Sequence, residues 1–243
     1  MNSTPLVECR DIAFERDDVP LFSGVNLRLL AGKAIQVTGA NGAGKTTFMR
    51  ILATSLAPSW GEILWRGQPL VRQLQDYRSN LLYIGHSPAV KAALSPRENL
   101  RWFFRLAPSR EQLSSVVIDS TLARVGLDGY GDVPCHTLSA GQLRRVALAR
   151  LYLSSARLWI LDEPFTSIDV EGVGNLERLM AEHLAAGGGL LMTSHQQLRL
   201  ENIDILDLEA FAGGCSQEPS PPHHDRFQHG QRQSAGFQGA HDR

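Results

Sequence analysis

Short apolar runs separated by turns occupy the first part of the chain and predict a β-rich region. Such runs recur through residues 6–38, and the last of them, Ala34–Thr38, leads directly into a glycine-rich segment. Residues 61–68 have the pattern of a further strand that ends in a turn. We therefore expect a small N-terminal sheet beside the segment that follows Thr38.

Longer apolar runs in the second half of the chain predict a parallel sheet. Residues 158–161 and 190–193 form continuous runs, as expected of buried parallel strands, and a helical pattern over residues 173–186 separates them. Strand, helix and strand in this order form a βαβ unit. Residues 203–208 predict a last strand, and residues 72–150 are mainly helical. The predicted fold class is therefore α/β.

The character of the chain changes at residue 213. Residues 213–243 are rich in Gly, Pro, Ser, Gln and His and nearly free of aliphatic side chains. This composition predicts a disordered tail after a single domain over residues 1–212. Four of the eight histidines lie in the tail. A metal- or haem-binding tail is the alternative, and the irregular spacing of the histidines argues against it.

Charge and composition narrow the function classes. The formal net charge of −1 gives no support for nonspecific nucleic-acid binding. We find no run of 18 apolar residues that would span a membrane and no secretory signal. The three cysteines are far apart and lack metal-binding spacing, which favours a reducing compartment. The cytosol is therefore the expected location.

A complete phosphate-binding loop, G-x-x-x-x-G-K-[ST], occupies residues 39–47. Its glycines allow the backbone N–H groups to point at phosphate oxygens. Lys45 adds a positive charge for the outer phosphates, and the Thr46 hydroxyl is placed to bind magnesium. The alternative is a glycine-rich turn with an incidental lysine. A strand before the loop and a helix after it, which we expect Pro58 to end, favour phosphate binding. The candidate phosphate ligands are Gly39, Ala40, Asn41, Gly42, Ala43, Gly44, Lys45, Thr46 and Thr47.

A pair of carboxylates follows the apolar run at residues 158–161. Asp162 and Glu163 would lie at the carboxyl end of a buried strand, which is the edge where α/β sheets bind ligands. Asp162 is placed to hold magnesium through water, and Glu163 to orient or deprotonate an attacking water. An acidic helix cap is the alternative, and it fits poorly because Pro164 follows at once.

A second anion-binding segment lies at residues 138–142, Leu-Ser-Ala-Gly-Gln. Ser139 has the position of a helix N-cap. The small residues Ala140 and Gly141 leave backbone amides open to an anion, so this segment predicts a phosphate contact separate from the first loop.

Taken in order, these segments make the chain similar to the ATP-binding-cassette (ABC) ATPases, whose signature segment is Leu-Ser-Gly-Gly-Gln. The similarity extends from about Leu6 to Leu208. It implies a P-loop NTPase core with an N-terminal antiparallel β region, an inserted helical lobe at about residues 87–150, and ATP and Mg²⁺ as cofactors. It also implies a head-to-tail dimer, in which Ser139, Gly141 and Gln142 of one subunit close on the ATP bound to the other.

The resemblance assigns roles to further residues. His195 matches the family's switch histidine, which contacts the γ-phosphate, and Asp169 would link the two sites across the dimer. His86 stands where the family usually has a glutamine, at the start of the lobe that contacts a partner protein. The family commonly stacks an aromatic residue on adenine near position 16. Here that residue is Arg16, with Phe14 the nearest aromatic, and a guanidinium can also stack on a base.

Within the family, the chain resembles most the ATP-binding subunit of the bacterial haem exporter of cytochrome c biogenesis. The features are the compact length, Glu-Arg at 15–16 before Leu-Phe at 21–22, Tyr-Ile-Gly-His at 83–86 in place of the glutamine, and the segments 138–142, 158–166 and 194–196. The resemblance implies ATP hydrolysis coupled to haem export through separate integral membrane permease subunits, at the cytoplasmic face of the inner membrane. No nucleic acid partner is expected. Cys135, His136 and the tail histidines are the candidate haem contacts, and a structural role is favoured for each.

Three alternatives remain at this point. The first is the ATPase subunit of an ABC exporter for another substrate. The second is a soluble ABC ATPase acting on ribosomes or DNA; such proteins usually carry two cassettes or a long coiled-coil insertion. The third is a P-loop kinase or small GTPase, in which residues 139–142 and 162–163 would have no role.

Overall fold

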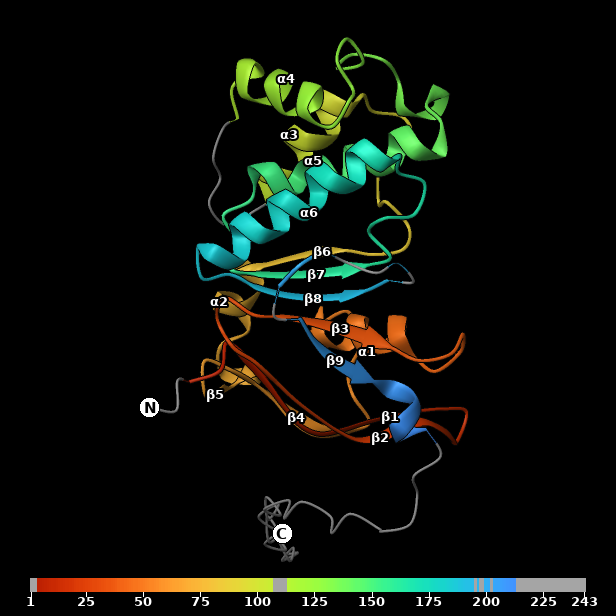
Figure 1. Ribbon diagram of the computed structural model, residues 1–243, viewed down its shortest axis with the longest axis vertical. Helices are drawn as coiled ribbons and strands as arrows, with labels where there is room; N and C mark the ends of the chain where they lie inside the picture. The colour runs from red at the N-terminus through yellow and green to blue at the C-terminus, as the bar shows by residue number, and fades with distance from the viewer. Residues whose placement is uncertain (1–3, 107–112, 195, 197–198, 202, 213–243) are drawn as a thin grey trace, which may run out of the picture.

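The fold is built on two β-sheets that lie one above the other (Figure 1). The computed structural model describes residues 4–106, 113–194, 196, 199–201 and 203–212. One sheet is parallel, with its five strands in the order β6-β7-β8-β3-β9. These strands are β3 (Ala34–Thr38), β6 (Leu81–Ile84), β7 (Leu158–Asp162), β8 (Gly189–Thr193) and β9 (Ile203–Asp207).

The second sheet is antiparallel and forms the N-terminal region. Its four strands lie in the order β2-β1-β4-β5. They are β1 (Val7–Arg16), β2 (Val19–Leu29), β4 (Trp60–Trp65) and β5 (Gln68–Pro69). Apolar side chains of this sheet pack with α1 and with one face of the parallel sheet in a continuous core. The phosphate-binding segment is therefore anchored between the two sheets.

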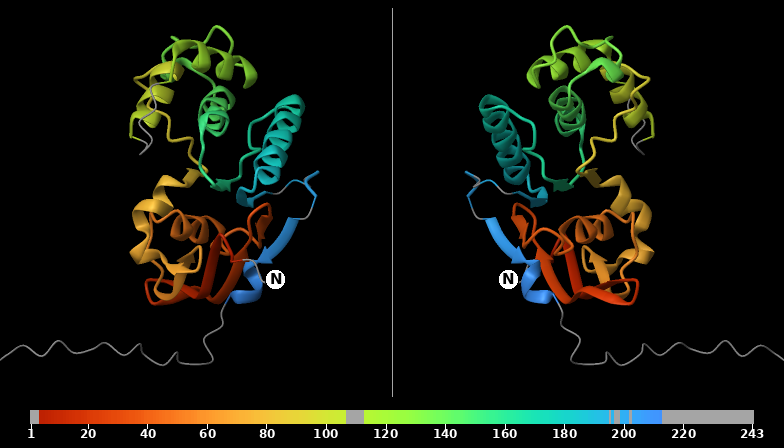
Figure 2. Two further views of the ribbon diagram at one scale, coloured as in Figure 1. Left: turned by 90° about the vertical axis from the view of Figure 1, so that its left-hand side faces the viewer. Right: turned by 90° about the vertical axis from the view of Figure 1, so that its right-hand side faces the viewer.

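Helices cover both faces of the parallel sheet (Figure 1). The α-helices are α1 (Lys45–Leu52), α2 (Leu74–Ser79), α3 (Pro96–Leu106), α4 (Ser115–Arg124), α5 (Ala140–Leu153) and α6 (Val170–Ala185). Three short 3₁₀ turns are η1 (Leu70–Arg72), η2 (Cys135–Thr137) and η3 (Leu208–Phe211). Side chains of α5 and α6 pack on the face of the sheet opposite α1. Helices α3, α4 and α5 also enclose a smaller core of their own, and Figure 2 shows them rising from the sheet beside α6.

Most of the predicted elements are present. The strand before the phosphate-binding loop is confirmed, and β7, α6 and β8 form the expected βαβ unit with adjacent parallel strands. The prediction that Pro58 ends the following helix is wrong: α1 ends at Leu52, and Thr54 adopts a left-handed conformation at φ 56°. Strand β6 was not expected within the mainly helical region. The predicted tail, residues 213–243, lies outside the described residues.

The carboxyl ends of the parallel strands bring the chemical segments to one edge of the sheet. In the register of the sheet, Asp162 of β7 pairs with Thr193 of β8, which in turn pairs with Val37 of β3. The phosphate-binding loop therefore starts two strands away from the carboxylates. Within the part of the chain that the structure describes, no helix has the length and apolar character needed to cross a membrane.

Candidate nucleotide-binding site

The phosphate-binding loop joins β3 to the N-terminus of α1. Gly44 is the N-cap of this helix and has φ 93°, a left-handed conformation that favours glycine. A Cβ atom at this position would lie 2.8 Å from Leu21 Cδ2, so the backbone also needs a residue without a side chain. The Lys45 ammonium donates hydrogen bonds to the carbonyl oxygens of Gly39 (2.7 Å) and Ala40 (3.0 Å), which holds it over the loop. Positive charge and a helix N-terminus thus meet at one point.

A cavity of about 430 Å³ opens in front of this loop. Its volume is within the range of small-molecule binding sites. It is lined by Arg16, Leu21, Asn41, Gly42, Gly44, Lys45, Thr46, Thr47, His86, Asp162, Glu163 and Thr166. Ten of these residues, all except Leu21 and Thr166, are ligand or catalytic candidates from the sequence, and the fold brings them into one cavity. Gly39, Ala40 and Ala43 belong to the loop but do not line the cavity.

The two candidates for the adenine contact are separated by the fold. Arg16 is exposed and lines the cavity beside Leu21. Phe14 instead packs against Phe22, with 6.4 Å between the ring centroids, at the margin of the core between the sheets. Arg16 is therefore the candidate that faces the place of a bound nucleotide.

The Asp162 carboxylate fits a divalent cation. The side chain is buried, with 2% of its surface exposed. One oxygen, Oδ1, accepts a hydrogen bond of 2.7 Å from the Thr193 hydroxyl. The other, Oδ2, has no hydrogen-bond partner among the described residues. An unpartnered buried carboxylate oxygen is costly unless a cation or water binds it, and hard oxygen ligands are those that Mg²⁺ prefers. The Thr46 hydroxyl lines the same cavity.

Glu163 has an unusual backbone conformation that its neighbours stabilise. Its φ is 50°, which is uncommon for a residue other than glycine. Its N–H group donates to the Thr193 hydroxyl (2.8 Å), and its carbonyl oxygen accepts from the Arg144 guanidinium (2.6 Å). Strained backbone of this kind concentrates at functional sites. No sequence pattern assigned a role to Arg144 or to the hydroxyl of Thr193.

The segment at residues 138–142 begins α5 as predicted. The Ser139 hydroxyl accepts a hydrogen bond from the Gln142 N–H, and the Gln142 side chain accepts one from the Ser139 N–H, so the two residues form a capping box. A Cβ atom at Gly141 would lie 2.9 Å from the Ser167 carbonyl oxygen. Among the described residues that line the nucleotide cavity, none comes from this segment. The segment and the cavity of one chain are therefore separate.

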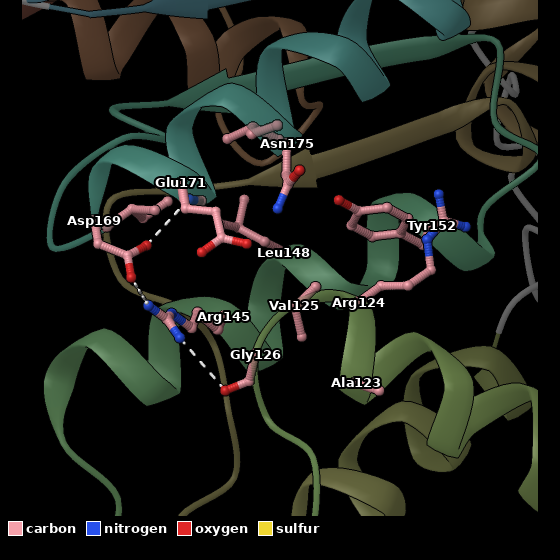
Figure 3. Close-up of a pocket in the computed structure, with 13 residues that line it drawn as sticks. Ala123, Arg124, Val125, Gly126, Arg145, Leu148, Tyr152, Asp169, Glu171 and Asn175 are labelled. Carbon is pink, nitrogen blue, oxygen red and sulfur yellow. Dashed lines mark hydrogen bonds and ion pairs between the residues drawn. The ribbon is translucent and has the colours of Figure 1, made fainter.

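A second, smaller cavity of about 130 Å³ lies between α4, α5 and α6 (Figure 3). Arg145 lines one end of it, where its guanidinium donates to the Gly126 carbonyl (3.4 Å) and forms an ion pair with Asp169 (2.8 Å). Asp169 is also the N-cap of α6, and the Gly172 N–H together with Arg145 holds the pKa of its carboxyl below the ordinary value. Arg145 thus joins the loop after α4 to the start of α6.

Three further predicted residues are not among the described residues that line the cavity. His195 lies outside the described residues; the strand that precedes it, β8, ends at Thr193. Cys135 is buried in the core of α3, α4 and α5, where its sulfur accepts a hydrogen bond from the Asn99 side chain (3.4 Å). His136 is exposed. The Cys135 side chain has a packing role in this core, as favoured from the sequence.

A phosphate-binding loop, a strand-end Asp-Glu pair and a capped Ser-Ala-Gly-Gln segment, arranged on these two sheets, define a P-loop ATPase of the ABC type. A family profile described as ABC transporter matches residues 22–166. The chain belongs to the ABC transporter family, as its ATP-binding, ATP-hydrolysing kind of subunit. The resemblance to this family and the fold that it implied are therefore confirmed.

Individual relatives are also similar over most of the chain. The cytochrome c biogenesis ATP-binding export protein CcmA of Escherichia coli (strain K12) is 48% identical over 200 residues, which is 82% of this chain and 94% of that protein. The protein of the same name from Shigella sonnei (strain Ss046) has the same identity and coverage. Among solved structures, a putative ABC transporter ATP-binding protein from Pyrococcus furiosus has a TM-score of 0.72 at 24% identity, covering 85% of this chain and 98% of that one.

Proposed function

We propose that this chain hydrolyses ATP at the cavity between residues 39–47 and Asp162-Glu163, and that it drives a cytochrome c biogenesis exporter. One observation supports the proposed ATP hydrolysis. The loop, Asp162 and Glu163 come from separate strand ends and line one cavity of about 430 Å³. A P-loop alone indicates nucleotide binding. A carboxylate pair facing it adds the groups needed for metal binding and hydrolysis.

The loop residues bind the phosphates in this proposal. Backbone N–H groups of residues 39–47 and the N-terminus of α1 stabilise negative charge, and Lys45 moves its ammonium from the loop carbonyls to the outer phosphates. Thr46 and Asp162 would hold Mg²⁺. When bound, this ion neutralises charge on the phosphate oxygens.

Glu163 is the proposed catalytic residue. Glu163 lines the cavity. Its carboxylate is proposed to orient the attacking water and to accept a proton from it at a carboxylate oxygen. His86 lines the same cavity from the end of β6 and is proposed to contact the same water or metal region. His195, as the switch histidine of the family, is proposed to sense the γ-phosphate.

The signature segment is proposed to act on the ATP of a second subunit. Ser139, Gly141 and Gln142 lie at the N-terminus of α5, which is a favourable position for an anion. They do not line the cavity of their own chain within the described residues. A head-to-tail dimer would bring this helix end to the phosphates held by the other loop, so that two composite sites form, each with ATP and Mg²⁺.

The cargo and the partners follow from similarity. Relatives 48% identical over 82% of the chain are named for cytochrome c biogenesis and export. We propose that this chain works in the same process, exporting haem through integral membrane permease subunits. It would then bind peripherally at the cytoplasmic face of the bacterial inner membrane, with no nucleic acid partner.

The variant Glu163→Gln tests the hydrolytic site. We expect kcat to fall about 100-fold or more, since a positioned general base contributes factors of about 10²–10⁴. ATP binding should persist, and the chain should accumulate as a dimer with ATP on size-exclusion chromatography. Glu182→Gln, an exposed change on α6, is the matched control and should leave kcat unchanged. Normal turnover by the Glu163 variant would remove this residue from its role.

Mixed dimers test whether the sites are shared between subunits. A chain with Lys45→Ala and a chain with Ser139→Arg should each lack activity. Mixed together, they should regain it, because one of the two sites in the mixed dimer then combines an intact loop with an intact signature segment. Sites confined to single chains predict no recovery, since every chain in the mixture carries a defect.

Co-purification tests the cargo. The full-length chain, tagged and extracted from its bacterial membranes, should retain permease subunits whose disruption stops cytochrome c maturation. Recovery of a sugar or drug permease would replace haem with another substrate. A chain found only on ribosomes or DNA would favour a non-transport ATPase.

A further inference from the structure

Arg144, in the second turn of α5, is a buried cation whose hydrogen bonds, among the described residues, go to main-chain carbonyls and not to a carboxylate. Its side chain belongs to a residue only 3% exposed, and among the described residues it forms no ion pair within 4.0 Å. Burial lowers the pKa of this guanidinium, while the more distant carboxylates of Asp162 and Glu163 act in the opposite direction. A charged group is retained in such a place when hydrogen bonds compensate it.

The hydrogen bonds of Arg144 all end on main-chain carbonyls at the catalytic edge of the sheet. One terminal nitrogen donates to the carbonyls of Gly85 (2.7 Å) and His86 (3.5 Å), which directly follow β6. The other donates to the carbonyls of Asp162 (2.9 Å) and Glu163 (2.6 Å) at the end of β7. A planar guanidinium can serve several acceptors in fixed directions, whereas an ammonium is a single point charge. The arrangement therefore depends on the shape of arginine as well as its charge.

These contacts meet at a residue with a constrained backbone. Glu163 has φ 50°, and its two main-chain polar groups are both occupied by side chains of other elements: the N–H by Thr193 and the carbonyl by Arg144. We propose that Arg144 is a positioning residue for ATP hydrolysis, whose guanidinium fixes the main chain of Glu163 and ties it through Gly85 to the strand end that carries His86. This inference rests on the catalytic role proposed for Glu163.

A second consequence concerns α5 itself. The same helix presents the capped signature segment at its first turn and Arg144 one turn later. A shift of α5 relative to the sheet must therefore change the hydrogen bonds on Glu163. The positioning of the general base in one site is thereby linked to the helix that serves the site of the other subunit.

Arg150 provides a matched control on the same helix. It is also buried, at 7% exposure, and burial lowers its pKa to about 10. Its Nε donates to the Ala147 carbonyl within α5 (3.0 Å), and its guanidinium lies over the ring of Phe103. Since it does not contact the strand ends, loss of Arg150 reports the structural cost of removing a buried arginine from α5.

Steady-state kinetics of Arg144→Met and Arg150→Met, measured on the full-length protein with any subunits that co-purify, test the proposal. We expect Arg144→Met to lower kcat about 10- to 100-fold, because misplacement of a catalytic group by about 1 Å costs up to about 100-fold. ATP affinity and KM should change less than about twofold, since the loop is untouched. Arg150→Met should lower thermal stability while retaining kcat. Equal kcat losses in the two variants, or a normal kcat in Arg144→Met, would overturn the proposal.

If Arg144→Met does not fold, Arg144→Lys tests whether Arg144 positions Glu163 for hydrolysis. A lysine keeps the charge, but its single ammonium nitrogen cannot replace the two terminal nitrogens that serve the carbonyls after β6 and those at the end of β7. We therefore expect a kcat between those of the wild type and of a variant without charge, with unchanged ATP affinity. Wild-type kcat in this variant would overturn the proposal.

The double variant Arg144→Lys/Glu163→Gln separates this inference from the proposed function. If Arg144 acts through Glu163, the lysine change should not lower the residual rate of Glu163→Gln any further. Additive losses would show that Arg144 acts elsewhere and overturn the inference. The Glu163→Gln single variant tests the proposed function by itself: normal ATP turnover in that variant would show that Glu163 is not the catalytic residue.

Discussion

The hydroxyl of Thr193 is the group whose removal we expect to have the clearest effect on both stability and turnover. It is fully buried at the end of β8, donates to Asp162 Oδ1 (2.7 Å) and accepts from the Glu163 N–H (2.8 Å). Thr193→Val replaces it with a methyl group of similar size. The change therefore removes two hydrogen bonds without opening a cavity.

The magnitude follows from the two bonds. A hydrogen bond to a charged group is worth about 1.5–3 kcal/mol, and one between neutral groups about 0.5–1.5 kcal/mol. Thr193→Val should thus lower the free energy of unfolding by about 2–4 kcal/mol. In a protein of this size each kcal/mol shifts the melting temperature by about 2–4 °C. Loss of the bond to the Glu163 N–H should also lower kcat.

Urea denaturation, followed by circular dichroism, measures the stability change, with ATPase assays on the same samples. Thr193→Ser is the control: it keeps the hydroxyl and loses one methyl group, which costs about 1 kcal/mol. The reasoning is refuted if the valine variant is as stable as the wild type. It is also refuted if serine and valine destabilise equally, because packing rather than hydrogen bonding would then explain the loss.

Three further predictions concern the phosphate-binding loop and helix α6. Gly44→Ala forces a side chain into a left-handed conformation and against Leu21, so calorimetry should show a loss of about 1–3 kcal/mol or more in unfolding free energy. Lys45→Ala should abolish ATP binding or turnover, and unchanged ATPase activity would contradict the loop assignment. His183 is stacked on Trp159, and burial lowers its pKa below the ordinary 6.5. Its neutral form is thus favoured by folding: its contribution to stability is complete above about pH 6.5, and it declines as the pH falls below that value towards the folded pKa. His183→Gln should flatten this part of the stability profile in urea titrations at several pH values.

Elements defined by local patterns could be predicted from the sequence. The continuous apolar run in β7 and the run in β8 have the signature of strands buried on both faces, and all residues of both strands are buried. Ser139 followed three residues later by Gln142 is a local capping signal, and the capping box forms. The phosphate-binding loop combines both kinds of signal, since a strand and a helix flank it.

Features that depend on tertiary contacts were missed. Strand β6 has only four residues within a helical region, and it forms because β7 offers a parallel edge. Helix α1 ends before Pro58 because Thr54 turns the chain into a left-handed conformation, which no local signal indicates. Arg144 has an arginine beside it in the sequence, yet one of the two is buried against carbonyls and the other pairs with an exposed carboxylate. Only the fold distinguishes them.

The short distance between Gly141 and the Ser167 carbonyl determines how the signature segment can vary in evolution. At the preceding position this chain has Ala140 in place of the family's first glycine, and that residue is exposed, so its methyl group extends into solvent. A methyl group at Gly141 would instead lie 2.9 Å from the Ser167 oxygen and push the start of α5 away from the segment that precedes α6. The two glycines of the family signature are therefore under unequal constraint. Natural variants and directed libraries should accept small side chains at position 140 and exclude them at position 141.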